Sequence, residues 1–381
     1  MTRSLPNTLS LSAPHGTTGI ASAEAVEATV ARIEQEARLP ERETARARIA
    51  AAMDAKVKPI GSLGRLEELA VRIAGIRATA NPDELGGSSA VVVCAADHGI
   101  TAEGVSPYPS VVTGLMLGSY AAGGAAVCVL CARNDTRLVV ADFGTADPPA
   151  CVGDTVLDRN VRRGTGNSAV EEAMTREEAL LAIRHGIEIA DALADDGITL
   201  IGLGEMGIGN TTTASAMTAR LLDVDPAAVC GPGTGLDSEK VRHKVEVVRR
   251  VLARHPDARE PLQVLAAMGG LEVAGLVGVV LGAAARRVPV VLDGFITTAA
   301  ALVAVEMAPA ARESLIAGHV SAEPGHAIQL DRLGLKPVLA LDMRLGEGSG
   351  AAVAIGVIRQ SLDILAGMAT YAELGIGGHA G

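Results

Sequence analysis

Apolar and polar positions divide the chain into a helical beginning and a middle part in which strands and helices alternate. Apolar residues recur at helical spacing over Ala23–Leu39, Glu41–Met53 and Leu66–Ala78. At Ser89–Ala95 the pattern becomes a continuous run of small and β-branched residues, typical of a strand buried on both faces. We therefore predict helices up to residue 78 and a first strand directly after them.

Three more short apolar runs predict strands at Leu138–Asp142, Thr199–Gly202 and Val288–Leu292. Between the strands lie segments with helical spacing: Glu177–Leu193, Thr211–Leu222, Glu239–Arg254 and Leu262–Ala267. Alternating strands and helices predict an α/β fold with a parallel sheet flanked by helices. Such sheets bind ligands at the carboxyl edge of their strands, which gathers Asp97, Glu205 and Asp293 into one crevice.

Neither the most apolar stretch nor the N-terminal segment indicates a membrane or secreted protein. The most apolar stretch, Val264–Ala285, contains Glu272 and several glycines, so tightly packed core helices are expected rather than a membrane span. Residues 1–22 are rich in Ser, Thr and Gly without an apolar core, which predicts a disordered tail rather than a signal peptide. We expect a cytoplasmic protein.

Composition excludes some classes of site. A net charge of −11 and 1% aromatic residues argue against nucleic-acid binding. Five cysteines are an odd number for a disulfide framework. Cys128 and Cys131 form a C-x-x-C inside an apolar run, with no second pair at zinc-ribbon spacing, so we interpret them as buried hydrophobic residues rather than metal ligands.

The loop that follows the third strand offers three interpretations. Gly202, Gly204 and Gly207 match G-x-G-x-x-G, and Asp223 lies near the offset of a ribose-binding acid, as in a dinucleotide site. Against this, the match lies in the middle of the chain, and Glu205 inside it would repel a pyrophosphate. A site for one phosphate or nucleotide at the following helix start is favoured, and a purely structural turn remains the third interpretation.

A second glycine loop, Gly231–Asp237, also leads into a predicted helix, which carries Lys240, Arg242 and Lys244. A loop, a helix start and a lysine together suit a phosphate, although the basic residues could equally solvate a helix face.

Near the C-terminus, Glu347 stands between Gly346 and Gly348, just ahead of an Ala-rich apolar segment. Apolar surroundings disfavour an ionised carboxylate and raise its pKa, so that it can act as a base near neutral pH. The alternative is a glutamate that only caps the following helix.

Several motifs occur together and in order. They are Lys58–Gly64 (KPIGSLG), Asp97-His98-Gly99, Gly207–Thr212 (GIGNTT), Gly233–Asp237 (GTGLD), Asp293-Gly294-Phe295, Gly318–His326 (GHVSAEPGH) and Arg344–Gly350 (RLGEGSG). With these motifs the chain resembles the nicotinate-nucleotide–dimethylbenzimidazole phosphoribosyltransferase family from about residue 25 to residue 375.

The resemblance implies a Rossmann-like large domain over residues 85–325 and a small helical domain built from both chain ends, residues 23–84 and 326–381. It also implies a homodimer. The implied reaction transfers 5-phosphoribosyl from nicotinate mononucleotide to 5,6-dimethylbenzimidazole, with α-ribazole 5′-phosphate and nicotinate as products.

The implied chemistry needs one base and no cofactor. Nicotinate leaves as a neutral ring, so no general acid is required, and no pyrophosphate departs, so no Mg²⁺ is required. The attacking azole must lose a proton, and the resemblance assigns this step to Glu347. Glu205 would oppose positive charge developing on the ribose, or would only brace its loop.

The remaining site residues follow from the matching motifs. Phosphate and ribose are expected to contact residues from four motifs together with Lys244 of the predicted helix Glu239–Arg254. The motif residues are Gly207, Gly209, Asn210, Thr211, Gly233, Thr234, Gly235, Asp293, Gly294 and Ser321. The base pocket is expected to involve Asp97, Ser106, Tyr108, Ser110, Met116, Met206 and Leu345. His98, His319 and His326 are expected to be structural.

Two positions depart from the family pattern. After Tyr-Pro, members commonly carry Gln and then Glu, whereas this chain has Ser110 and Val111. The loss of an amide leaves the acceptor open: adenine or another benzimidazole remains an alternative to dimethylbenzimidazole. A nucleotide-binding sensor without turnover and an NAD-dependent oxidoreductase are the competing functions.

Overall fold

The computed structural model describes residues 19–233, 235 and 237–375. Its centre is a parallel six-stranded sheet in the order β3-β2-β1-β4-β5-β6. The strands are β1 (Ser88–Ala96), β2 (Thr136–Gly144), β3 (Leu157–Asp158), β4 (Ile198–Met206), β5 (Val290–Leu292) and β6 (Leu315–Ala317). The predicted α/β class and all four predicted strands are confirmed, whereas β3 and β6 were not predicted because segments of this length carry no periodic signal.

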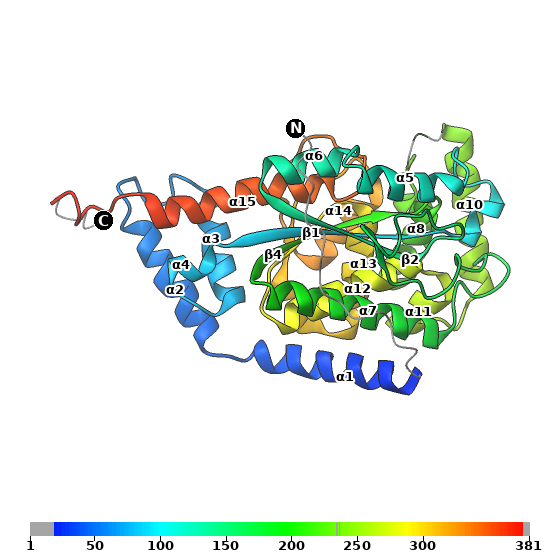
Figure 1. Cartoon of the computed structure of the whole chain (residues 1–381), viewed down its shortest axis with the longest axis horizontal. Helices are drawn as coiled ribbons and strands as arrows, with labels where there is room; N and C mark the ends of the chain where they lie inside the picture. Colours follow the sequence, from blue (N-terminus) through cyan, green and yellow to red (C-terminus); the bar gives the residue numbers. More distant parts are fainter. Residues whose placement is uncertain (1–18, 234, 236, 376–381) are drawn as a thin grey trace.

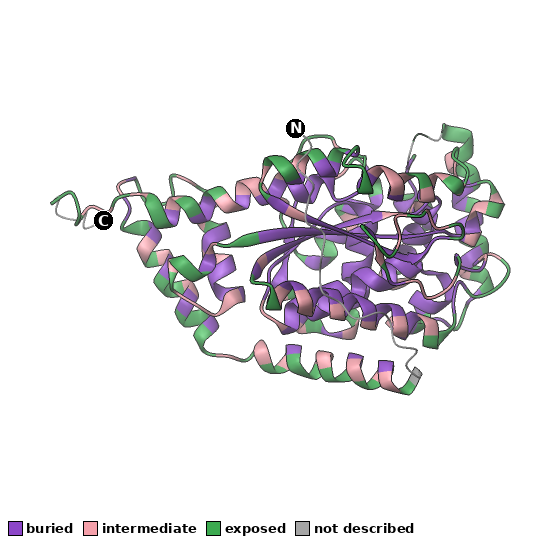
Figure 2. Ribbon diagram, viewed as in Figure 1, coloured by how far each residue is buried: buried purple, intermediate pink, exposed green. Residues whose placement is uncertain are grey.

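Helices cover both faces of this sheet (Figure 1). Alternate side chains of β1 enter two separate apolar cores: Val92 and Cys94 pack with one face, Val91 and Val93 with the other. Figure 2 shows the resulting buried centre. The continuous apolar run that predicted β1 therefore reflects a strand that is buried on both sides.

The helices have the following bounds. They are α1 (Gly19–Glu36), α2 (Glu41–Asp54), α3 (Arg65–Arg77), α4 (Pro82–Leu85), η1 (Gly99–Glu103), α5 (Val111–Ala121), α6 (Ala126–Arg133), α7 (Arg176–Asp195), α8 (Asn210–Leu222), α9 (Pro226–Val229), α10 (Ser238–Arg254), α11 (Pro261–Met268), α12 (Leu271–Ala285), α13 (Phe295–Met307), η2 (Pro309–Ser314), α14 (Pro324–Leu333) and α15 (Ser349–Gly367).

Helix α12 is the core helix of one face, and every one of its residues is buried. It lies so close to α7 that a Cβ atom at Gly278 would overlap the carbonyl oxygen of Ile183. The prediction of core helices over this apolar stretch is confirmed. By length and composition alone, Val111–Arg133 and Ser349–Gly367 could cross a membrane. Both pack on the sheet here: α6 contacts β2, and α15 contacts β4 and β5.

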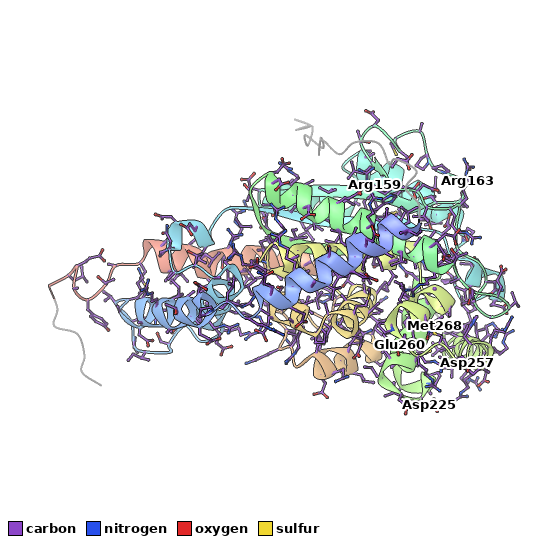
Figure 3. The ribbon with its side chains drawn as sticks, turned by 90° about the horizontal axis from the view of Figure 1, so that it is seen from below. Arg159, Arg163, Asp225, Asp257, Glu260 and Met268 are labelled. Atoms are coloured by element: carbon purple, nitrogen blue, oxygen red, sulfur yellow. The ribbon has the colours of Figure 1, made fainter. Side chains whose placement is uncertain are left out.

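Helices from the first and last parts of the chain meet at one end of the sheet, where α2 and α3 pack together and α3 packs on α15 (Figure 1). Lys56 and Thr370 form an isolated bridge there, and the Tyr371 hydroxyl donates to the carbonyl oxygen of Lys58 at 3.1 Å. Two other helices depart from the predicted small domain. Helix α1 lies along α7 and α12 (Figure 3), and α14 packs against α13 and α9, so both belong to the large core.

Helix α1 also corrects the predicted tail. It begins at Gly19, four residues before the expected start, and Ser22, a residue type favoured at helix N-caps, lies buried inside it. Residues 1–18 of the predicted tail lie outside the described residues.

Candidate active site

A cavity of about 550 Å³ opens at the carboxyl edge of the sheet, where the loops after β4, β5 and β6 meet the turn that precedes α15. It is lined by Tyr108, Val112, Met116, Glu205, Met206, Gly207, Ile208, Asn210, Thr211, Gly233, Gly294, Phe295, Ile296, His319, Ser321, Glu323, Arg344, Leu345, Gly346 and Glu347. The structure thus brings most of the residues predicted from separate motifs to one place.

Glu347 lies in a left-handed turn just before the N-terminus of α15. Its φ is +62°, and its neighbours Gly346 and Gly348 have φ of +82° and +80°. A left-handed conformation costs a residue with a side chain about 1–2 kcal/mol, so surrounding contacts must hold Glu347 in place. The flanking glycines are needed twice over, since a Cβ at Gly346 would overlap Glu205 and one at Gly348 would press on Val91.

Asp293, directly after β5, holds this turn through three hydrogen bonds to its backbone. Its Oδ1 accepts the backbone N–H of Gly350 at 2.6 Å and of Ala351 at 3.1 Å, and its Oδ2 accepts that of Gly348 at 3.1 Å. A carboxylate at a helix N-terminus satisfies N–H groups that have no partner within the helix. Asp293 was predicted to contact ribose, but it does not line the cavity, and its oxygens are engaged by the α15 backbone.

The carboxyl groups of Glu205 and Glu347 both line the cavity. Burial raises the pKa of Glu347, and the negative charge of Asp293 adds to this, while Tyr120 opposes it. Burial also raises the pKa of Glu205, to about 8, although a hydrogen bond from the Asn210 amide lowers it. Glu205 can therefore exchange protons near neutral pH, and the pKa of Glu347 is shifted in the same direction, as is typical of an acid–base site.

Another part of the cavity wall is formed by the start of α8 and by the loop before α10. Lys244 is completely buried, and its Nζ donates to Thr211 Oγ1 at 2.8 Å and to the carbonyl oxygen of Gly231 at 3.4 Å. The Gly233 N–H donates to Glu323 Oε1 at 2.8 Å, and Glu323 Oε2 is buried without a hydrogen-bond partner among the described residues. This wall presents a hydroxyl and a backbone N–H that a carboxylate already occupies, and the Lys244 ammonium is buried behind it.

The cavity also has an apolar region formed by side chains of α5, the end of β4 and the loop after it, the start of α13 and the turn before α15. Its members are Val112, Met116, Met206, Ile208, Phe295, Ile296 and Leu345. Ser110 does not reach it, because its hydroxyl is bonded to that of Thr101 at 3.1 Å. Ser106 also lies outside, where its hydroxyl accepts the Tyr108 N–H at 3.1 Å.

The other predicted residues lie near the cavity without lining it. Asp97 accepts the Ala146 N–H at 2.9 Å, and Gly209 is the N-cap of α8 with a φ of +97°. Gly235 is exposed, and Thr234 lies outside the described residues. Sequence reasoning did not assign seven lining residues to the site. Five of them lie within the matching motifs (Ile208, Phe295, Glu323, Arg344 and Gly346), and Val112 and Ile296 lie outside the motifs and carry no signal of their own.

The geometry removes the dinucleotide interpretation of the glycine motif. Gly202 and Gly204 lie within β4 and not in the loop, and Gly204 packs directly against the backbone of Glu347. Asp223 is the C-cap of α8 and does not follow a strand. The remaining glycines, Gly207 and Gly209, form a short turn into α8.

Two of the three loop histidines have the structural role that was predicted. His98 is fully buried and bonded to Glu272 at 2.8 Å and to Thr213 at 3.2 Å. His326 accepts the Ser321 N–H at 3.0 Å, and burial lowers its pKa to about 3. His319 differs, since it lines the cavity with its Nε2 3.5 Å from Asp293 Oδ1.

The cysteines and candidate metal ligands give no further site. All five thiols are free, Cys128 and Cys131 are buried, and burial raises the pKa of Cys131 to about 12. Within residues 19–233, 235 and 237–375, no group of three or more His, Cys, Asp or Glu side chains is placed to hold a metal ion.

Comparison with known proteins agrees with the motifs. A family model described as Phosphoribosyltransferase matches residues 39–376. The chain is 46% identical over 333 residues to nicotinate-nucleotide–dimethylbenzimidazole phosphoribosyltransferase of Salinispora tropica, covering 84% of this chain and 91% of that protein. It belongs to this family. The protein of the same name from Halalkalibacterium halodurans is 48% identical over 322 residues, covering 84% of this chain and 89% of that protein.

The fold agrees as well. The crystal structure of CobT from Thermus thermophilus superposes with a TM-score of 0.84 at 45% identity, covering 88% of this chain and 99% of that one. The family resemblance and the predicted fold class are thereby confirmed.

Proposed function

We propose that this chain transfers the 5-phosphoribosyl group of nicotinate mononucleotide to a ring nitrogen of a benzimidazole-type base, with Glu347 as the general base. The observation that carries the proposal is the position of Glu347. Its carboxyl group lines a cavity of about 550 Å³ whose lining also includes an apolar region and the loops in front of a buried lysine. A flat azole fits the apolar region and a phosphate fits the loops, and the azole N–H would then lie beside the carboxylate.

The phosphate is proposed to bind at Thr211, Gly233, Gly294 and Ser321, with the Lys244 ammonium behind them. The start of α8 adds the favourable end of a helix dipole. Because Glu323 occupies the Gly233 N–H in this structure, an incoming phosphate must displace that hydrogen bond. Its negative charge would be compensated by Lys244, which is bonded to Thr211 on the same wall.

Glu205 is proposed to stabilise the positive charge of the donor. With a pKa raised to about 8, it is mostly neutral at neutral pH in the empty site. The pyridinium donor brings a positive charge close to it, and an adjacent opposite charge favours the ionised carboxylate. Ionisation of Glu205 would thus follow donor binding and precede cleavage of the bond to nicotinate.

The acceptor is proposed to be dimethylbenzimidazole, held by apolar contacts in place of the amide that Ser110 does not supply. Apolar contacts discriminate among flat azoles less sharply than hydrogen bonds do. We expect this enzyme to use adenine and other benzimidazoles in competition with dimethylbenzimidazole. Exclusive use of one base in a mixture would refute this part of the proposal.

A cytoplasmic homodimer completes the proposal. Val111 and Leu115 on α5 and Val129 on α6 are 58%, 66% and 64% exposed. Apolar side chains exposed on neighbouring helices are typical of an interface. Sedimentation of the purified protein at micromolar concentration would show a single species of monomer mass if this were wrong.

The test is product analysis. Purified protein is incubated with nicotinate mononucleotide and a mixture of azoles, and the ribotides formed are identified by mass. Glu347→Gln should fold and bind nicotinate mononucleotide but lose about 10²–10⁴-fold in turnover. Glu246→Gln, a change at an exposed glutamate on α10, serves as the matched control and should retain turnover. Near-normal turnover of Glu347→Gln at neutral pH would refute the assignment of the base.

A further inference from the structure

Tyr120 near the end of α5 has a buried hydroxyl group with no role in packing. The side chain is 3% exposed and lies in the apolar core shared by α5, the sheet and α15, beside residues such as Leu117 and Ala351. Its hydroxyl forms no hydrogen bond within the described part of the chain. A buried hydroxyl without a partner is destabilising, so its presence calls for an explanation.

The hydroxyl lies close to the proposed base. Glu347 and Glu205 are the carboxyl groups that act on the Tyr120 hydroxyl, and Glu347 is the one within side-chain bonding reach. In return, Tyr120 lowers the pKa of Glu347 against the effect of burial. Burial raises the pKa of Tyr120 itself, so its hydroxyl keeps its proton and can donate it to a hydrogen bond over the working range of pH.

The other charged and titratable groups around Glu347 do not offer such a donor. Glu205 approaches from β4 and Asp293 from β5, and the oxygens of Asp293 are engaged by backbone N–H groups. Cys128 faces Glu347 from α6 with a pKa that burial raises. His319 is directed at Asp293, and Arg344 lies in the same turn at the cavity wall.

We infer that Tyr120 is a positioning residue for Glu347: its hydroxyl donates a hydrogen bond to the ionised carboxylate and fixes the direction in which the base faces the acceptor. The inference rests on the proposed function, in which Glu347 accepts the azole proton. Hydrogen bonds to an ionised acceptor are shorter and stronger than neutral ones, so this bond forms when Glu347 is charged and weakens once it has taken the proton.

Tyr120→Phe removes the hydroxyl and leaves the ring, so it tests the inference with little change in volume. Without the donor, the ionised form of Glu347 is less stable and its pKa rises. In a plot of kcat/KM for the azole against pH, the rise on the acidic side should move to higher pH by about 1 unit. We call this rise the acidic limb, and a shift of this size matches the strength of one hydrogen bond to a charged group. Above the limb, turnover should stay within about threefold of the parent, and KM for nicotinate mononucleotide should not change.

Tyr371→Phe is the matched control, because it removes a tyrosine hydroxyl that bonds Lys58 at the junction of the chain ends. It should leave the acidic limb in place. Thermal unfolding of Tyr120→Phe should show a midpoint within a few degrees of that of the parent, because the ring and its apolar contacts remain. A limb that does not move, or an equal loss of activity at every pH, would overturn the inference.

Glu347→Gln separates this inference from the proposal on which it rests. If Glu347→Gln retains turnover, the assignment of the base fails and that of Tyr120 fails with it. If Glu347→Gln is inactive and the limb of Tyr120→Phe is unmoved, the base stands and the positioning role alone is rejected.

Discussion

Replacement of Asp293 by asparagine should weaken both the fold and the proposed site. The carboxylate accepts three backbone N–H groups at the start of α15, two on Oδ1 and one on Oδ2. An asparagine can keep the two bonds to Gly350 and Ala351 through its oxygen. Its NH₂ group then faces the Gly348 N–H, and neither of the two can accept.

The expected cost follows from these contacts. One buried N–H without a partner costs about 1–3 kcal/mol, and the lost attraction between a negative charge and the helix N-terminus adds about 0.5–1 kcal/mol. The substitution also removes the repulsion between the negative charge of Asp293 and the carboxyl groups of Glu205 and Glu347, whose pKa values Asp293 raises. This gain offsets part of the cost. We expect Asp293→Asn to lower the free energy of unfolding by about 2–3 kcal/mol.

Activity should fall as well, since the turn that carries Glu347 loses one of its bonds. A displacement of the base by about 1 Å can reduce turnover 10²-fold. The pH profile adds a directional check: without the charge of Asp293, the pKa of Glu347 falls, and the acidic limb should move to lower pH.

Urea unfolding at 25 °C and steady-state kinetics measure both effects. Asp225→Asn is the control (Figure 3), because Asp225 accepts the Ala227 N–H at 2.8 Å with a side chain that is 64% exposed. Its change should stay within about 0.5 kcal/mol. If Asp293→Asn matched the parent in both unfolding and turnover, Asp293 would not hold the turn.

Two further predictions concern stability. The pKa of Glu205 is about 8 in the folded chain, above its ordinary value of 4.5, so its contribution to stability is complete below pH 4.5 and is lost as pH rises toward 8. Glu205→Gln should remove a decline of up to about 1.4 kcal/mol per pH unit between pH 5 and 8, and equal slopes for variant and parent in urea unfolding would contradict this. Gly278→Ala should separate α12 from α7 and cost about 2–3 kcal/mol in thermal unfolding. Gly118→Ala in α5, where a Cβ meets nothing within 4 Å, should be neutral or stabilising, and similar effects of the two substitutions would argue against the close packing.

The parts of the fold that could be predicted are those in which local pattern and tertiary burial agree. Strand β1 is apolar at successive positions because both of its faces are covered, and α7 has the spacing and cap of an ordinary amphipathic helix. Strands β3 and β6 have two and three residues, and they exist only through pairing with their neighbours. The position of α1 could not be predicted, since an amphipathic pattern does not say which surface covers its apolar face.

The site shows the same limit. The glycines around Glu347 indicated positive φ and close approach, and the structure has both. The role of Asp293 could not be read from sequence, because it depends on how the end of β5 meets the start of α15, more than 50 positions later in the chain. The same holds for the Gly233–Glu323 bond, which places a carboxylate where a phosphate was expected.

The bonds between Asp293 and the α15 backbone have a consequence for the order of folding. The left-handed turn at Glu347 costs energy by itself, and what offsets that cost comes from a strand end formed much earlier in the chain. Conversely, Asp293 is a buried carboxylate that lacks its three backbone N–H partners until α15 docks. The turn and the carboxylate stabilise each other, so the proposed base takes up its position only when the sheet and the final helix close on each other. A partly folded chain with the sheet formed but α15 undocked would lack the reactive carboxylate. Catalytic activity would therefore be found only in chains that have completed folding.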